Sequence, residues 1–206
     1  MELNDKQIQI LEATEKLFAE NGFDGTSVRQ ISKAADINIA MISYYFGSKE
    51  KLLEALLTYR MSDFRMQLES AISKSNDYFE VLDDIVSLIV KRIHRNRRTH
   101  KIINFEYSNG CRNIDFDSYV ENKKENLKVI ENFVNRGQKE KIFIQNVQIE
   151  LLMATILGTY FHFYYNKKFY QALLNLTDEA AIERYVHATL TQHIQQTIKA
   201  LLTNAV

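Results

Sequence analysis

Residues 27–46 read SVRQISKAADINIAMISYYF, and this stretch decides how the surrounding chain folds. Its first part predicts a short helix with one apolar stripe, formed by Val28, Ile31 and Ala35. Ser27 and Gln30 have the spacing of a capping box, which fixes the start of that helix. After it, Asp36 tolerates a left-handed backbone, and Asn38 can cap a second helix. The stretch therefore predicts two short helices joined by a tight turn.

The second of these helices has an uncharged outer face. Ile42 and Phe46 are four positions apart and point toward the core, so the opposite face is centred on Tyr44. The other residues of that face and its flanks are Ile39, Ala40, Met41, Ser43 and Tyr45. This helix has about two turns, and only a few of its residues pack in the core. A short helix with such an exposed face suits insertion into the major groove of DNA.

The order of GTSVRQIS (25–32), Ile37 and YYFGSKEKL (44–52) closely resembles the N-terminal domain of TetR-family transcriptional regulators. The resemblance covers about the first 60 residues, and beyond them it extends only to a helical body of the usual family length. It implies an all-α protein of about nine helices. A three-helix DNA-binding head would occupy residues 1–48, with its helix-turn-helix motif at about 27–46. A larger effector-binding and dimerisation body would occupy residues 49–206.

By this resemblance, the head contacts DNA at a small set of positions. Thr26 and Ser27 are expected to hydrogen-bond phosphate, and Arg29 to reach a base edge or a phosphate. Tyr44 would contact phosphate or pack on a sugar. Lys49 would hold a phosphate at the start of the next helix, the alternative being a capped helix with solvated lysines. The full predicted set is Thr26, Ser27, Arg29, Gln30, Asn38, Ile39, Ala40, Met41, Ser43, Tyr44, Tyr45 and Lys49.

The chemistry of the outer face predicts the kind of operator. Members of the family commonly place a lysine, a tyrosine and a histidine where this chain has Ile39, Ser43 and Tyr45. Ile39, Ala40 and Met41 can pack on thymine methyl groups but make few hydrogen bonds. We therefore expect an operator rich in A·T contacts, with much of the affinity coming from phosphate.

The charge of the chain is balanced, with 26 Lys and Arg against 26 Asp and Glu. Residues 1–50 carry five basic and eight acidic side chains, which is a net charge of −3. Sequence-independent DNA binding relies on counterion release, so this charge argues against an architectural DNA-binding protein. Sequence-specific DNA binding therefore requires the acidic side chains to lie away from the DNA. The cations expected to approach phosphate are Arg29, Lys33, Lys49 and Lys51.

The absence of proline and the low glycine content favour long helices in the rest of the chain. Apolar spacing predicts them over residues 5–21, 48–73, 78–94, 102–107, 118–137, 147–166 and 177–201. Gly137 is expected to cap one of these helices at its C-terminus. The basic run Lys91–Lys101 could contact nucleic acid or an anionic effector, but such a run is more often a solvated helix end and loop.

The body is expected to enclose an effector pocket, by resemblance rather than by any motif. Its candidate lining residues, each of which is more often ordinary core, are Phe105, Tyr107, Phe133, Met153, Tyr160 and Tyr164. Aromatic rings with polar tips suit an apolar or aromatic small molecule. The helices at 147–166 and 177–201 lack a wide polar face, which indicates a subunit interface. The resemblance likewise implies a homodimer that spaces its heads on a palindromic operator.

The leading hypothesis is a homodimeric repressor that a small-molecule effector releases from double-stranded DNA. The effector would favour one position of the helix at 48–73, which joins head and body. A helical enzyme is the alternative from another class, but no nucleophile–base pair, phosphate loop or metal-spaced cluster supports it. His94 and His100 lack neighbouring ligands, so neither a metal site nor a cofactor is predicted.

Cys111 is the one cysteine, which rules out an internal disulfide and suits a reducing cytoplasm. An inert thiol is the more common role for such a residue than a redox sensor. The N-terminus MELNDKQ lacks a signal-peptide pattern, and no apolar run is long enough to cross a membrane. We therefore expect a cytoplasmic protein without a membrane partner.

Overall fold

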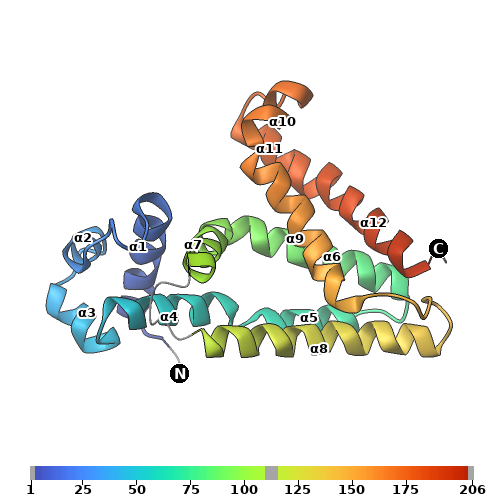
Figure 1. Ribbon diagram of the computed structural model, residues 1–206, viewed down its shortest axis with the longest axis horizontal. Coiled ribbons are helices and arrows are strands. Elements are labelled where there is room, and N and C mark those ends of the chain that lie inside the picture. The colour runs from blue at the N-terminus through green and yellow to red at the C-terminus, as the bar shows by residue number, and fades with distance from the viewer. Residues whose placement is uncertain (1–2, 110–115, 204–206) are drawn as a thin grey trace. The chain divides into compact units, whose positions relative to one another are not determined.

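The computed structural model describes residues 3–109 and 116–203. Regular structure within these ranges is helical throughout (Figure 1), so the all-α prediction is confirmed. None of the described helices is long and apolar enough to span a membrane. Cys111, for which an inert thiol was expected, lies outside the described residues. The helices are α1 (Asp5–Asn21), α2 (Val28–Ala34), α3 (Ile39–Phe46), α4 (Lys49–Met61), α5 (Phe64–Ser73), α6 (Tyr78–Arg95), α7 (Arg97–Asn109), α8 (Asp117–Lys139), α9 (Ile149–Tyr165), α10 (Lys167–Leu174), α11 (Glu179–Tyr185), η1 (Val186–Leu190) and α12 (Thr191–Thr203).

The chain forms two compact units, each with its own hydrophobic core. The first unit comprises Met1–Asp63 and Asn96–Lys123, and the second comprises Phe64–Arg95 and Lys124–Val206. The first unit therefore includes α7 as well as α1 to α4. The predicted division into a DNA-binding domain at 1–48 and an effector-binding and dimerisation domain at 49–206 concerns function, and it stays a prediction.

The core of the first unit forms between α1 and the helices around it. α1 contacts α2, α4 and α7, and α3 contacts α2 and α4. The largest fully buried side chains are Ile10, Leu11, Ile31, Ile42, Leu52, Leu53, Leu56 and Leu57. α2 buries only Ile31 and Ser32, and α3 buries only Ile42. Helices this short are not stable alone, so α1 and α4 hold α2 and α3 in position.

One buried carboxylate ties three helices of the first unit together. Glu15 of α1 is 7% exposed, and its Oε2 accepts hydrogen bonds from Nε (3.1 Å) and Nη2 of Arg60 on α4. Its Oε1 accepts a hydrogen bond from the hydroxyl of Thr99 on α7. Both carboxylate oxygens are therefore hydrogen-bonded, which offsets the cost of burying the charge.

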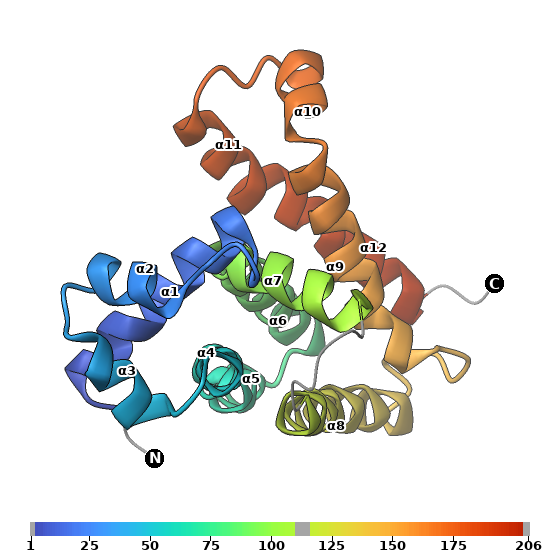
Figure 2. The same ribbon diagram turned by 60° about the vertical axis from the view of Figure 1, so that its left-hand side comes forward.

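The second unit is built around α6. This helix contacts α5, α9, η1 and α12. Its buried apolar side chains are Val81, Leu82, Ile85, Val86, Ile89, Val90 and Ile93. α9 and α12 also contact each other and run side by side in opposite directions (Figures 1 and 2). The helices predicted at 78–94 and 147–166 correspond to α6 and α9.

Three of the predicted helices differ from the observed ones: two contain an interruption, and one is followed directly by a further helix. The helix expected at 48–73 is interrupted at Ser62, whose Oγ donates to the carbonyl oxygen of Tyr59 (3.0 Å). Serine and the following Asp63 favour such local hydrogen bonds over a regular helix. α10 follows α9 after the single residue Asn166. The helix expected at 177–201 contains the π-helical segment η1. The structure consequently has more helical segments than expected, within the same all-α fold.

Gly137 lies inside α8 rather than at its end, so the expected helix cap is wrong. The helix continues to Lys139, and the left-handed backbone after it occurs at Lys141 (φ 62°). A Cβ atom on Gly137 would lie 2.4 Å from the ring of Phe143. The glycine therefore provides space for a buried phenylalanine.

The basic run Lys91–Lys101 contains the end of α6 at Arg95 and has exposed cations, so the solvated helix end is confirmed in part. The expected loop is wrong, because α7 begins at Arg97, directly after Asn96. Arg92 is 7% exposed, and its guanidinium carbon lies 4.8 Å from the centroid of the Phe64 ring. Lys101 Nζ donates to the carbonyl oxygen of Ala19 (2.8 Å), near the C-terminal end of α1, where a positive charge is favourable. Part of this positive charge therefore stabilises the fold.

Glu15→Ala should lower the free energy of unfolding by about 2–4 kcal/mol, because it removes the acceptor that Arg60 and the buried Thr99 hydroxyl share. Glu12→Ala is the matched control, since Glu12 is an exposed residue of the same helix. That substitution should change the free energy by less than about 0.5 kcal/mol. Urea unfolding followed by circular dichroism measures both values. Equal effects of the two substitutions would contradict the structural role of Glu15.

Candidate DNA-binding site

Local side-chain hydrogen bonds build the turn between α2 and α3. Ser27 Oγ accepts a hydrogen bond from the backbone N–H of Gln30 (3.2 Å), and Gln30 Oε1 accepts one from the backbone N–H of Ser27 (2.7 Å). Asp36 adopts a left-handed backbone (φ 47°). Asn38 Oδ1 accepts a hydrogen bond from the N–H of Ala40 (2.9 Å). The predicted capping box, turn and second cap are therefore confirmed.

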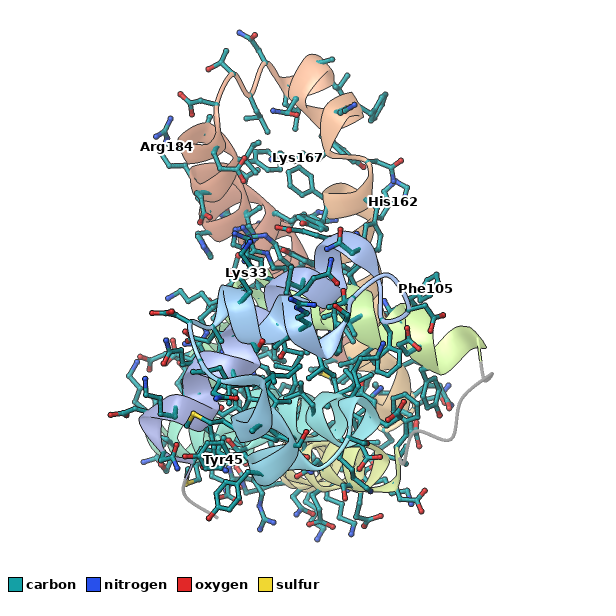
Figure 3. All side chains as sticks on the ribbon, turned by 90° about the vertical axis from the view of Figure 1, so that its left-hand side faces the viewer. Lys33, Tyr45, Phe105, His162, Lys167 and Arg184 are labelled. Atoms are coloured by element: carbon teal, nitrogen blue, oxygen red, sulfur yellow. The ribbon has the colours of Figure 1, made fainter. Side chains whose placement is uncertain are left out.

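α3 presents the outer face that its spacing predicts. Ile42 is 2% exposed and anchors the helix, whereas Tyr44 is 84% exposed. The other exposed residues of the face are Asn38, Ile39, Ala40 and Ser43, with Met41 and Tyr45 half-buried. The rings of Tyr44 and Tyr45 pack edge to face with centroids 5.2 Å apart, and Figure 3 shows Tyr45 projecting from α3. No charged side chain lies between Asn38 and Phe46.

Two cations of α2 are not used by the fold. Arg29 and Lys33 are exposed, and within the described part of the chain neither side chain makes an ion pair or a hydrogen bond. Figure 3 shows Lys33 extending from α2. Such cations can bind phosphate without first breaking an internal contact. Lys51 differs from them, because it forms an ion pair with Glu54 (2.7 Å).

Lys49 makes contacts inside the first unit, whereas a contact with phosphate was expected. Its Nζ donates to the carbonyl oxygens of Phe23 (2.9 Å) and Thr26 (3.0 Å) and lies 4.1 Å from the centroid of the Phe23 ring. These contacts join the start of α4 to the connection between α1 and α2. Two of the three ammonium N–H donors are therefore engaged internally. We withdraw Lys49 from the principal phosphate contacts.

The predicted phosphate contact of Thr26 is wrong. Thr26 is 1% exposed, and its Oγ1 donates to the carbonyl oxygen of Gly22 (2.8 Å) and lies 3.2 Å from that of Leu17. A hydroxyl buried in this way cannot reach a phosphate. No local pattern indicates the contact with Leu17, because that acceptor lies nine residues earlier in the chain.

Two of the six predicted effector-pocket residues belong to the first unit. Phe105 and Tyr107 lie on α7 and are 58% and 56% exposed, and Figure 3 shows the Phe105 side chain. Neither residue lines the groove of about 270 Å³ in this unit, whose lining residues are Lys51, Glu54, Ala55, Leu57, Thr58, Ser118 and Tyr119. Burial raises the pKa of the Tyr119 hydroxyl in this groove to about 12.

The other four predicted effector-pocket residues pack in the core of the second unit. Phe133 and Tyr160 are buried, while Met153 and Tyr164 are half-buried against the same core. The Phe133 ring packs against that of Phe143 (centroids 5.8 Å apart), and the Tyr160 ring stacks on that of Tyr164 (6.1 Å). The observed role of these residues is packing, and an effector pocket lined by them stays a prediction.

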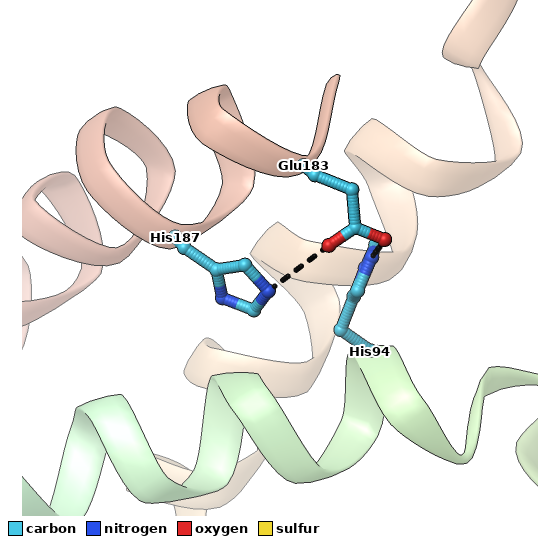
Figure 4. A group of neighbouring side chains, drawn as sticks. All are labelled: His94, Glu183 and His187. Atoms are coloured by element: carbon cyan, nitrogen blue, oxygen red, sulfur yellow. Dashed lines mark hydrogen bonds and ion pairs between the residues drawn. The ribbon is translucent and has the colours of Figure 1, made fainter. Parts of the chain in front are cut away.

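Three side chains of the second unit form a cluster that the sequence patterns did not predict (Figure 4). His94 of α6, Glu183 of α11 and His187 of η1 each place a potential ligand atom within 4.8 Å of the other two. The expectation that His94 lacks neighbouring ligands is therefore wrong. The partners were missed because Glu183 lies 89 residues away from His94. The one local signal is the spacing of Glu183 and His187, which places them on the same helix face.

A capped pair of short helices, with an uncharged exposed face on the second and unpaired cations on the first, defines a helix-turn-helix protein of the DNA-binding class. Residues 10–56 match the profile of the family described as "Bacterial regulatory proteins, tetR family". The match assigns this N-terminal domain to the TetR type, and it covers residues 10–56 of the 206-residue chain. The expected family resemblance is confirmed.

Two relatives match the chain over its N-terminal part. YttP of Bacillus subtilis (strain 168), named "Probable HTH-type transcriptional regulator", is 37% identical over 97 residues, which are 46% of this chain and 47% of YttP. The HTH-type transcriptional repressor NicS of Pseudomonas putida is 38% identical over 80 residues, 39% of this chain and 38% of NicS. The matched segments therefore span less than half the length of each of these two relatives.

A likeness in fold extends over almost the whole chain. The crystal structure of the transcriptional regulator FadR from Bacillus subtilis, in complex with stearoyl-CoA, superposes with a TM-score of 0.72. The match covers 95% of this chain and 98% of FadR at 19% sequence identity. At this identity, the comparison supports the helical fold of both units.

Lys49→Ala should lower the free energy of unfolding by about 1–3 kcal/mol, because two backbone carbonyls lose their charged donor and Phe23 loses a cation–π contact. Lys51→Ala removes the same charge two positions later, where the ammonium makes a surface ion pair. That loss should cost less than about 1 kcal/mol. Urea unfolding of both proteins makes the comparison. A Lys49→Ala protein as stable as Lys51→Ala would show that Lys49 does not hold the unit together.

Proposed function

We propose that this protein is a sequence-specific transcriptional regulator that places α3 in the major groove of double-stranded DNA. The observation that carries the proposal is the outer face of α3, which is uncharged and centred on the 84% exposed Tyr44. The membership of residues 10–56 in a family of regulatory proteins supports the same function. The family is not one of enzymes, and the helix-turn-helix motif provides a surface for recognition.

The residues of this face divide into those that read bases and those that bind phosphate. Apolar groups for thymine methyls come from Ile39, Ala40 and Met41. Ser43 and Tyr44 offer hydroxyls to a base edge or a phosphate. Arg29 and Lys33 supply the cations, and the N-termini of α2 and α3, at Ser27 and Asn38, supply backbone N–H groups. Gln30 is engaged in the capping box and positions the start of α2.

The homodimer forms through α9 and the helix that runs from α11 to α12. Along α9, a stripe of exposed residues recurs every three or four positions, and its members are Leu151, Ala154, Gly158, His162 and Tyr165. Leu151 and Tyr165 are 59% and 53% exposed, and a second chain would cover them. Between them, the small residues Ala154 and Gly158 allow another helix to approach closely. A symmetric dimer of this kind presents two α3 helices to a palindromic operator.

The regulator acts in the cytoplasm as a repressor that a small-molecule effector releases from its operator. An effector that binds more tightly to one arrangement of the protein lowers operator affinity by the same coupling free energy. Two likenesses support this part of the proposal: NicS is named a repressor, and FadR was crystallised with stearoyl-CoA. The aromatic content of the second core suits an apolar or aromatic effector.

Duplexes selected from a randomised pool by the wild-type protein should share a palindromic consensus with A·T pairs where α3 binds. Arg29→Ala and Tyr44→Ala should each weaken binding to that consensus about 5–150-fold, the equivalent of about 1–3 kcal/mol. Lys16→Ala removes an exposed cation of α1 and should leave the affinity unchanged. Fluorescence anisotropy at one fixed salt concentration measures all four proteins.

Two outcomes of this experiment would overturn the proposal. No enriched sequence at low salt would show that α3 does not read DNA. An equal loss of affinity in Arg29→Ala and Lys16→Ala would show that net charge alone sets the binding. A consensus with G·C pairs at the α3 contacts would overturn the reading of thymine methyls by Ile39, Ala40 and Met41.

Leu151→Glu should convert the homodimer into monomers, because it places two like charges at a symmetric apolar interface. Met66→Glu is the matched control, since Met66 is 64% exposed on α5 of the same unit. That protein should stay dimeric. Size-exclusion chromatography with light scattering measures the mass of each protein. A dimeric Leu151→Glu protein, or a monomeric wild type at micromolar concentration, would contradict the proposed interface.

A further inference from the structure

We propose that His94, Glu183 and His187 form a binding site for a divalent transition metal ion of the Zn²⁺ type (Figure 4). Two imidazoles and one carboxylate are a ligand set that Zn²⁺ takes in proteins. The site lies wholly in the second unit and does not depend on the proposed DNA-binding function. It would connect α6 to the junction of α11 and η1.

The distances within the cluster are close to those of a metal site. His94 Nε2 lies 2.9 Å from Glu183 Oε1, and His187 Nε2 lies 3.3 Å from Glu183 Oε2. Ligand atoms around tetrahedral Zn²⁺ are about 3.3 Å apart, because each lies about 2 Å from the ion. All three ligand atoms already lie within 4.8 Å of one another, so small side-chain rotations bring them to one ion. The carboxylate faces both imidazoles, as Figure 4 shows.

Tyr160 orients His94 for this role. Its hydroxyl lies 2.8 Å from His94 Nδ1, and the tyrosine is fully buried. Metal-binding histidines usually hydrogen-bond through the ring nitrogen that does not bind the metal, which fixes the tautomer. A tyrosine hydroxyl can accept a hydrogen bond from Nδ1–H, and this tautomer presents the Nε2 lone pair to a metal ion. Without the ion, the same hydroxyl can donate to Nδ1 while Nε2–H donates to Glu183.

The backbone at His187 gives an independent indication of function. His187 lies in η1, a π-helical segment within an otherwise α-helical stretch. π-Helical turns are rare and occur frequently at functional sites. The hydroxyl of Thr191 donates to the carbonyl oxygen of Val186 (2.7 Å), which supports the irregular turn. The segment therefore has its own stabilising contact next to the proposed ligand.

The three side chains differ in exposure, and the cluster is in contact with solvent at His187. His94 is 5% exposed, Glu183 is half-buried and His187 is exposed, so one side of the cluster opens to solvent. Three protein ligands leave a fourth position of tetrahedral Zn²⁺ to water. The single negative charge of Glu183 neutralises only one of the two positive charges of the ion. Because Glu183 is half-buried, solvent can screen the remaining positive charge.

Isothermal titration of the whole 206-residue chain with zinc chloride tests the site. The wild-type chain should bind one Zn²⁺ with an affinity that His187→Ala and Glu183→Gln each reduce more than about 10-fold. Zn²⁺ should also raise the Tm of the wild type and not that of His187→Ala, because an ion that binds the folded state stabilises it. Bound Co²⁺ should show the visible absorption of a tetrahedral site in the wild type.

His193→Ala is the matched control, since His193 is an exposed histidine of α12 in the same unit. This protein should bind Zn²⁺ as the wild type does. His187 is exposed, so His187→Ala should keep the circular dichroism and Tm of the metal-free wild type. Equal Zn²⁺ affinity in the wild type and His187→Ala would overturn the proposal. A wild-type protein that does not bind Zn²⁺, or a loss of binding in His193→Ala, would do the same.

Discussion

The first unit depends on a carboxylate buried among its helices. Glu15 accepts hydrogen bonds from Arg60 and Thr99 and so connects α1 with α4 and α7. α2 and α3 bury too few residues to fix their own positions, so the outer face of α3 takes its geometry from the surrounding helices. Lys49 also joins elements of this unit, because it connects the start of α4 to the segment that precedes α2. These polar contacts fix the helices against which Ile42 of α3 packs, so they position its outer face indirectly.

Internal contacts of the first unit use part of its positive charge. Arg60 and Lys101 bind a carboxylate and a helix-end carbonyl, and these contacts hold them against the protein. Arg29 and Lys33 stay available to an external anion, within a segment whose net charge is negative. We expect a segment with this charge to attract DNA in general only weakly, because that attraction depends on the number of phosphates neutralised. Under the proposed function, discrimination between sequences depends on the fit of α3 rather than on bulk charge.

Local structure could be predicted from the sequence where its cause is local. The capping box of Ser27 and Gln30 and the exposure of Tyr44 follow from residues within one or two helical turns. The environments of Thr26 and Lys49 could not be predicted, because carbonyl oxygens on other elements decide them. The His94 cluster was missed for the same reason, since its partners come from the far end of the chain. Helical period alone cannot show which faces of distant helices meet.

The π-helical segment η1 affects how this helix compares with those of other proteins. A π-helical turn holds one residue more than an α-helical turn, and an extra residue rotates everything after it by about 100° around the helix axis. The side chains of α12 therefore point in other directions than they would if the α-helix that begins at Glu179 continued without the π-helical turn. An alignment with a relative that has an unbroken helix needs a one-residue gap within Val186–Leu190. Without that gap, each position of α12 would be aligned with one that faces a direction about 100° away.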